Sequence, residues 1–130
     1  MRVLIADDSA FIRDRLQEML IPFGQVEIVG SYTNGTDALE ALQSLNPDLA
    51  IMDIKMPGMN GLEVLKEIRK KNKTMQFIIL TFHATDFHRR TAMESGADYF
   101  FSKVDEFEKI GGVVNEILQL NLEQLIKIKV

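Results

Sequence analysis

The chain contains no cysteine and no tryptophan, and only three of its 130 residues are proline. The absence of cysteine excludes disulfide bonds and thiolate metal sites, and it is compatible with a reducing compartment. No apolar run approaches the roughly 18 residues that a membrane span needs, and the run after Met1 is too short for a signal peptide. We therefore expect a soluble, cytoplasmic protein with no membrane partner.

Basic residues are outnumbered, with 15 Lys and Arg against 19 Asp and Glu, so the net charge is −4. Such a balance offers no basic surface to neutralise phosphates, and we do not expect direct binding to nucleic acid. Hydrophobic residues make up 46% of the 130. This length and composition fit one globular domain that buries a substantial core.

Strand and helix patterns alternate along the chain. Short apolar runs predict five strands, at residues 3–6, 26–32, 49–52, 77–80 and 99–102. Apolar residues spaced by three and four predict helices near 11–20, 38–45, 62–68 and 84–95, and a last one from about Asp105 to Leu120. Parallel neighbours need helical crossovers, so the pattern predicts an α/β fold. We expect a doubly wound, flavodoxin-like sheet of five parallel strands in the order 2-1-3-4-5, with helices on both faces.

Polar residues follow four of these strands at the point where each strand ends. They are Asp7 and Asp8, Asp53, Thr81 and Lys103. The carboxyl ends of parallel strands meet at one edge of the sheet, where ligands bind in open α/β folds. The sequence therefore predicts that three carboxylates, a hydroxyl and an ammonium group converge at that edge.

Five motifs occur together in a specific order and spacing: Asp7-Asp8-Ser9 with Arg13, the segment 52–61, Leu80-Thr81, Gly96-Ala97-Asp98, and the segment 99–103 that ends at Lys103. In this order they resemble the receiver domain of two-component response regulators. The resemblance covers residues 2 to 120, approximately. It implies that Asp53 accepts a phosphoryl group from a histidine kinase or a phosphotransfer protein.

The resemblance also implies a role for each polar residue of the edge. Asp8 would bind Mg²⁺ directly, Asp7 would bind it through water, Asp53 would be a further ligand, and Lys55 would supply a backbone carbonyl. Thr81 would sense the phosphoryl group and Lys103 would pair with it. These roles agree with elementary chemistry, because clustered carboxylates repel one another and Mg²⁺ prefers oxygen ligands. An ionised carboxylate can attack phosphorus, and the transfer needs mainly positioning and charge neutralisation.

Signalling would follow from a contact that differs between two conformations. The resemblance implies that Thr81 moves toward the phosphoryl group and that Phe100, three residues before the lysine, fills the vacated space. A downstream protein would bind the face formed by the fourth helix, the fifth strand and the fifth helix. Strand aromatics commonly belong to the core, and this alternative for Phe100 stays open.

Two residues depart from the family pattern. Phe82 follows the threonine where receivers usually have a small residue, and we expect its ring to restrict access to the site. Val104 follows the lysine in place of a proline, and we expect a trans peptide bond before it. Lys55 and His83 occupy the two variable positions that modulate phosphoryl lifetime in this family.

We expect residues 1–120 to form the receiver domain and residues 121–130 to extend the last helix, with no output domain. Gly111-Gly112 lies inside that predicted helix and costs roughly 1 kcal/mol per glycine relative to alanine. The predicted protein is a stand-alone, non-enzymatic signalling domain with Mg²⁺-dependent self-phosphorylation from donors and autodephosphorylation. The alternative is a receiver-shaped interaction module that works without phosphorylation. A haloacid-dehalogenase-type phosphatase would need Asp-x-Asp after its first strand, where this chain has Asp7-Asp8-Ser9.

Overall fold

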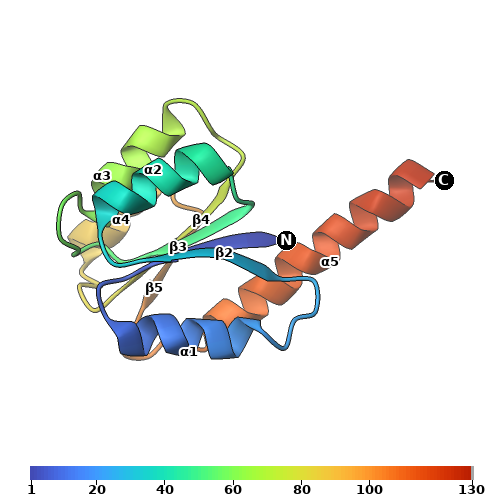
Figure 1. The fold of residues 1–130 in the computed structure, drawn as a ribbon, viewed down its shortest axis with the longest axis horizontal. Coiled ribbons are helices and arrows are strands. Elements are labelled where there is room, and N and C mark those ends of the chain that lie inside the picture. The colour runs from blue at the N-terminus through green and yellow to red at the C-terminus, as the bar shows by residue number, and fades with distance from the viewer. Residues whose placement is uncertain (130) are drawn as a thin grey trace.

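A computed structural model describes residues 1–129, which form one parallel sheet covered by helices on both faces (Figure 1). The strands lie in the order β2-β1-β3-β4-β5, and every neighbouring pair is parallel. Their bounds are β1 (Arg2–Ala6), β2 (Glu27–Tyr32), β3 (Leu49–Met52), β4 (Gln76–Thr81) and β5 (Tyr99–Ser102). The predicted fold and strand order are confirmed.

The helices within residues 1–129 are α1 (Ala10–Leu20), α2 (Gly35–Leu45), α3 (Gly61–Arg69), α4 (Asp86–Glu94) and α5 (Lys109–Lys129). The first four begin at polar caps whose side chains accept a hydrogen bond from a backbone N–H three residues later: Ser9, Asn34, Asn60 and Thr85. Each cap satisfies one of the N–H groups that a helix start leaves without a partner.

Alternate residues of the central strands face two separate cores. Leu4 and Ala6 of β1 pack with α2, α3 and α4, whereas Val3 and Ile5 pack with α1 and α5. Figure 1 shows α2 and α3 on one side of the sheet and α1 and α5 on the other. Because β1, β3 and β4 are buried on both faces, their sequences are apolar runs without alternation.

The last helix begins at Lys109, so the predicted start near Asp105 is wrong. Residues 103–108 instead lie in turns, next to two hydrogen bonds between Ser102 and Glu106. The backbone N–H of Glu106 donates to the Ser102 carbonyl at 3.0 Å, and the Glu106 carboxylate accepts from the Ser102 N–H at 3.1 Å. Gly111 and Gly112 consequently lie in the first turn of α5, where the penalty predicted for a helix interior does not fully apply.

Helix α5 has two parts with different surroundings. Ile110, Val113, Val114 and Ile117 are buried against the sheet, while the carboxyl-terminal part projects from the body (Figure 1). No helix within residues 1–129 is long and apolar enough to cross a membrane. The same residues contain no cis peptide bond, as expected for the bond before Val104.

Candidate functional site

The carboxyl ends of β1 and β3 bring three carboxylates together. Ala6 and Met52 are register partners in the sheet, so Asp7 and Asp53 leave adjacent strands at the same level. One oxygen from each of Asp7, Asp8 and Asp53 lies within 4.8 Å of the others. Asp7 and Asp53 are buried, at 1% and 6% exposure, whereas Asp8 is exposed. The cluster is therefore open to solvent on the Asp8 side.

Lys103 supplies the positive charge at this cluster. Its Nζ lies 2.6 Å from Asp7 Oδ2 and 2.9 Å from Asp53 Oδ2, and the residue is 6% exposed. Burial raises the pKa of Asp7, and the repulsion from Asp53 adds to this, while hydrogen bonds from Lys103 and from the Ser9 N–H oppose the rise. The Lys103 ammonium group thus offsets part of the free-energy cost of burying the Asp7 carboxylate and of placing it next to Asp53.

The Asp53 carboxylate is held at both oxygens. Oδ2 contacts Lys103, and Oδ1 accepts a hydrogen bond of 2.7 Å from the N–H of Ile54. The segment behind it is tightly packed, because a Cβ added to Gly61 would lie 2.0 Å from the Asp53 carbonyl oxygen. Only glycine allows the start of α3 to approach β3 this closely, so Asp53 has little freedom to move.

Thr81 ends β4 beside the cluster and is fully buried. Its Oγ1 accepts a 3.0 Å hydrogen bond from the N–H of His83, which leaves the hydroxyl proton able to donate elsewhere. Its carbonyl accepts a 2.9 Å bond from the N–H of Lys103, which ties the ends of β4 and β5 together. The hydroxyl and the ammonium group are therefore positioned by adjacent strands.

Phe82 stands at the rim of the site. Its ring is 61% exposed, and Lys103 Nζ lies 4.9 Å from the ring centroid, within cation–π range. The two other positions predicted to modulate the site lie on the same sheet edge: Lys55 is exposed in the loop after β3, and His83 is partly buried after β4. The roles predicted for Lys55 and His83 remain predictions.

A network around Phe100 escaped the sequence reasoning. Phe100 is 4% exposed, and the Arg89 guanidinium lies 4.7 Å from its ring centroid and donates to its carbonyl at 3.0 Å. Arg89 also contacts Glu106 at 3.3 Å, and the Glu106 carboxylate accepts from the Ser102 N–H. That backbone bond is the largest cause that lowers the pKa of Glu106. Arg89, at 45% side-chain exposure, carried no sequence signal, because its partners are distant in the chain.

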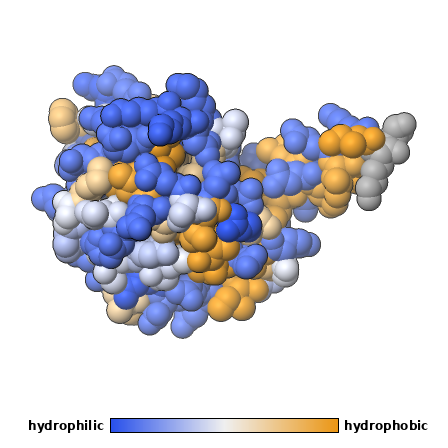
Figure 2. Space-filling model, turned by 45° about the horizontal axis from the view of Figure 1, so that its top comes forward, coloured by the Kyte–Doolittle hydropathy of each residue, from blue (hydrophilic) through white to orange (hydrophobic). Residues whose placement is uncertain are grey.

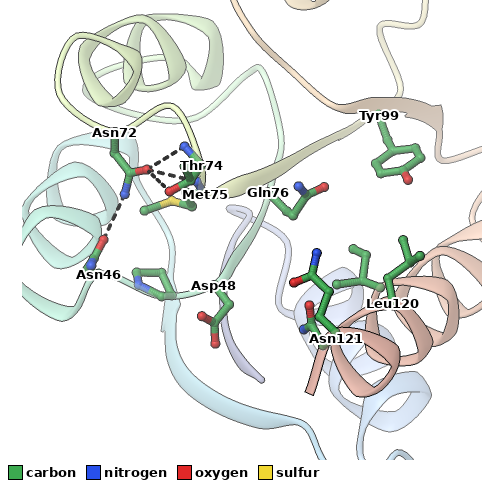
Figure 3. Close-up of a pocket in the computed structure, with 12 residues that line it drawn as sticks. Asn46, Asp48, Asn72, Thr74, Met75, Gln76, Tyr99, Leu120 and Asn121 are labelled. Atoms are coloured by element: carbon green, nitrogen blue, oxygen red, sulfur yellow. Dashed lines mark hydrogen bonds between the residues drawn. The ribbon is translucent and has the colours of Figure 1, made fainter. Parts of the chain in front are cut away.

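A second hollow lies at the opposite edge of the sheet, between the β3 and β4 starts and α5 (Figure 3). It has a volume of about 520 Å³ and is lined mainly by amides and other neutral side chains. Asn72 Nδ2 donates to Asn46 Oδ1 at 2.9 Å, and Asn72 Oδ1 accepts from Thr74 and Met75. These groups satisfy one another, so the acidic edge is the stronger candidate for chemistry.

The sequence model for the response regulator receiver domain matches residues 3–115. The chain belongs to this family. Chemotaxis protein CheY of Thermotoga maritima is 34% identical over 116 residues, which cover 89% of this chain and 96% of that protein. A protein-glutamate methylesterase/protein-glutamine glutaminase of Alkalilimnicola ehrlichii is 38% identical over 120 residues. That match covers 89% of this chain, but this receiver spans only about a third of the length of such methylesterase relatives.

Solved receiver structures agree with the fold and the order of strands. The response regulator domain of Thermotoga maritima CheB has a TM-score of 0.79 and 31% identity, and covers 92% of this chain and 94% of its own. The receiver domain of the putative response regulator NarL from Mycobacterium tuberculosis has a TM-score of 0.82 at 28% identity, with coverages of 91% and 95%.

Receiver domains generally bind Mg²⁺ at an acidic pocket and interact with histidine kinases and phosphotransfer proteins. The donor set of this receiver fits that ion. Asp7, Asp8 and Asp53 offer hard carboxylate oxygens within 4.8 Å of one another, and Mg²⁺ is commonly bound by one or two carboxylates together with water and phosphate oxygens. The exposed side of the cluster leaves room for those further oxygen ligands.

Proposed function

We propose that this receiver accepts a phosphoryl group on Asp53 from a histidine kinase or a phosphotransfer protein in a Mg²⁺-dependent reaction. It then signals through contact with a downstream protein. The observation that carries the proposal is the convergence of Asp53 with Asp7, Asp8 and the Lys103 ammonium group at one sheet edge. Structural ion pairs also form buried clusters, but a cluster of three carboxylates that opens to solvent is suited to receive a ligand.

Each residue has a defined part in this chemistry. The Asp53 Oδ2 oxygen attacks phosphorus, the P–N bond to the donor histidine breaks, and the electron pair of that bond returns to the imidazole nitrogen. Lys103 then pairs with a phosphoryl oxygen, while Asp7, Asp8, Asp53 and the Lys55 carbonyl would hold the metal ion. The ion neutralises phosphoryl charge when bound. Thr81 donates a hydrogen bond to an oxygen that exists only after transfer.

The signal would pass from Thr81 to Phe100 and then to the α4–β5–α5 face. Movement of the Thr81 hydroxyl toward the phosphoryl group vacates space on the β5 side. Phe100 is 4% exposed and belongs to the core, with the Arg89 guanidinium over its ring, so a movement of the ring would disturb Arg89 on this face. Phosphorylation would therefore change both the shape and the charge of the surface offered to a partner.

This receiver would act as a signalling domain and not as an enzyme on other molecules. It would phosphorylate itself from donors and would hydrolyse its own aspartyl phosphate, with Lys55, Phe82 and His83 modulating the rates. The match to 96% of chemotaxis protein CheY of Thermotoga maritima supports a receiver that acts as a signalling domain.

The test is the intact mass of the protein after incubation with acetyl phosphate and Mg²⁺. We expect a gain of one phosphoryl group that is abolished by Asp53→Asn or by removal of Mg²⁺ with a chelator. Asp105→Asn, which changes an exposed carboxylate in the β5–α5 turn, is the matched control and should be phosphorylated normally. Failure with acetyl phosphate, with phosphorylated kinases and with beryllofluoride would instead support the phosphorylation-independent interaction module.

A further inference from the structure

The carboxyl-terminal part of α5 carries an apolar stripe that the rest of the protein does not cover. The family match ends at residue 115, whereas α5 continues to Lys129 and leaves the body of the domain (Figure 1). The stripe starts at Leu118, which is partly buried against the core. Leu122 and Leu125 follow at spacings of four and three residues, so the three lie along one side of the helix, and Ile126 adjoins them. Leu122, Leu125 and Ile126 are 53%, 50% and 55% exposed.

This stripe continues into a groove at the base of the projecting helix. The groove has a volume of about 350 Å³ and lies between Leu118, Leu122 and Leu125 on one side and Met1 and Phe23 on the other. Figure 2 shows apolar residues along the projecting helix, on the face turned toward the viewer. The same surface thus carries an exposed apolar ridge, formed by the stripe, and next to it a groove that is also lined largely by apolar residues.

The projecting part of α5 lacks the packing that holds its first turns. Residues 118–129 extend the helix by about 18 Å from the part that packs on the sheet, and most helical stability in proteins comes from packing of an apolar face. Exposed contiguous apolar patches of this kind mark interaction surfaces. The four-three spacing of the leucines is that of the contact positions of a coiled coil, which favours another helix as the occupant.

We infer that a second copy of this chain covers the stripe, so that two α5 helices pair antiparallel about a two-fold axis near Leu122. In this arrangement the stripe of each copy enters the groove of the other, and the tip bearing Leu125 and Ile126 reaches the partner's Phe23. Two-fold pairing requires such a self-complementary surface, in which the same patch supplies the ridge and the hollow.

The distribution of charge selects the antiparallel orientation. Residues 118–130 contain one glutamate and two lysines, so their net charge is +1. Because the whole chain has a net charge of −4, residues 1–117 have a net charge of −5. Parallel helices would place two strongly acidic bodies side by side at one end. Antiparallel helices place the bodies at opposite ends of the pair and bring each near the less acidic segment of its partner, which lowers their repulsion.

Sedimentation equilibrium of the full chain at about 100 µM tests the inference. We expect a mass of twice 14.8 kDa for the wild type and 14.8 kDa for Leu122→Glu. Leu120→Glu is the matched control, because Leu120 is 54% exposed on the opposite side of the same helix and should leave the dimer intact. Phosphoryl uptake on Asp53 should be unchanged in both variants, which verifies that the body remains folded.

Orientation is tested with single cysteines, since the chain has none of its own. Under oxidation Leu122→Cys should form a disulfide-linked dimer, while Leu125→Cys should not, because two copies of residue 125 would be offset by about 9 Å along antiparallel helices. A monomeric wild type, a dimeric Leu122→Glu or a monomeric Leu120→Glu would overturn the assignment. A wild-type monomer that floats with anionic lipid vesicles would assign the stripe to a membrane surface instead.

Discussion

At the scale of single residues, Phe82 stands beside the acidic cluster. Phe82 is 61% exposed and Lys103 Nζ lies 4.9 Å from its ring centroid, so we expect the ring to restrict the approach of a phosphoryl donor. We expect Phe82→Ala to accelerate phosphorylation by acetyl phosphate. The cation–π contact that is lost is worth about 0.5–1 kcal/mol at an exposed site, which corresponds to roughly a 2- to 5-fold change in rate.

The measurement is a time course of intact mass under identical donor and Mg²⁺ concentrations. Phe87→Ala provides the comparison, because Phe87 is an equally exposed aromatic residue, at 70%, on α4. An unchanged or slower uptake in Phe82→Ala would show that the ring assists the donor or leaves it unhindered.

The residues of the site were predictable from the sequence because each directly follows an apolar run, and parallel strands bring such positions to one edge. Asp7, Asp53, Thr81 and Lys103 all occupy that edge in the structure. The contact between Phe82 and Lys103 was not predictable, because two side chains on neighbouring strands can meet or diverge with a change of rotamer. The same limit hid the Arg89 network, whose members are 11 and 17 residues apart.

At the scale of secondary-structure elements, the close approach of α3 to β3 depends on Gly61. A Cβ at this position would lie 2.0 Å from the Asp53 carbonyl oxygen, which is backbone and cannot swing aside. We expect Gly61→Ala to lower the free energy of unfolding by about 1–3 kcal/mol and to slow phosphoryl uptake, because Asp53 must shift.

Gly112→Ala is the control for this substitution, because a Cβ there meets no atom within 4 Å. Alanine is the better helix former, so this change should raise the free energy of unfolding by up to about 1 kcal/mol. Urea unfolding of both variants measures the two effects. Similar decreases of the unfolding free energy in both variants would show that the backbone near Asp53 can shift to accommodate the added Cβ.

Arg89 joins α4 to β5 and to the turn before α5 through the Phe100 carbonyl, the Phe100 ring and Glu106. We expect Arg89→Gln to cost about 1–2 kcal/mol of unfolding free energy and to speed amide hydrogen exchange in α4 and β5. Arg90→Gln changes the exposed neighbour and should stay within about 0.5 kcal/mol of the wild type. Equal amide hydrogen exchange rates in the two variants would show that Arg89 does not stabilise the packing of α4 on β5.

Most element boundaries were predictable to within a few residues, since polar caps such as Asn60 and the turn at Asn46 mark them. The start of α5 was not. The bonds between Ser102 and Glu106 hold residues 103–108 in turns, and a Ser and a Glu four residues apart are equally compatible with a helix. Local side-chain bonds compete with helix formation in ways that composition does not reveal.

At the scale of the whole molecule, the acidic edge links stability to both pH and Mg²⁺. Burial raises the pKa of Asp7 above 3.8, so the folded protein holds this proton more tightly than the unfolded chain. Ionisation of Asp7 therefore reduces stability as the pH rises through the interval above 3.8. Bound Mg²⁺ would favour the ionised carboxylates, so its stabilising effect should weaken as the pH falls through the raised pKa of Asp7 and be larger at neutral pH.

Thermal unfolding with and without Mg²⁺ at each pH measures this linkage. At a concentration 100 times the dissociation constant, the ion should add about 2.7 kcal/mol at neutral pH. Asp8→Asn removes the exposed ligand of the cluster and should abolish the gain. An equal gain at both pH values, or in Asp8→Asn, would show that the ion acts elsewhere on the protein.

The position of Lys103 between Asp7 and Asp53 has a further consequence. Its ammonium group neutralises part of the negative charge of the two carboxylates before a metal ion or a phosphoryl group binds. The buried carboxylates therefore have a counterion from their own polypeptide, whether or not a metal ion is bound. We therefore expect the chain to fold without Mg²⁺ and to bind the ion in a separate, later step.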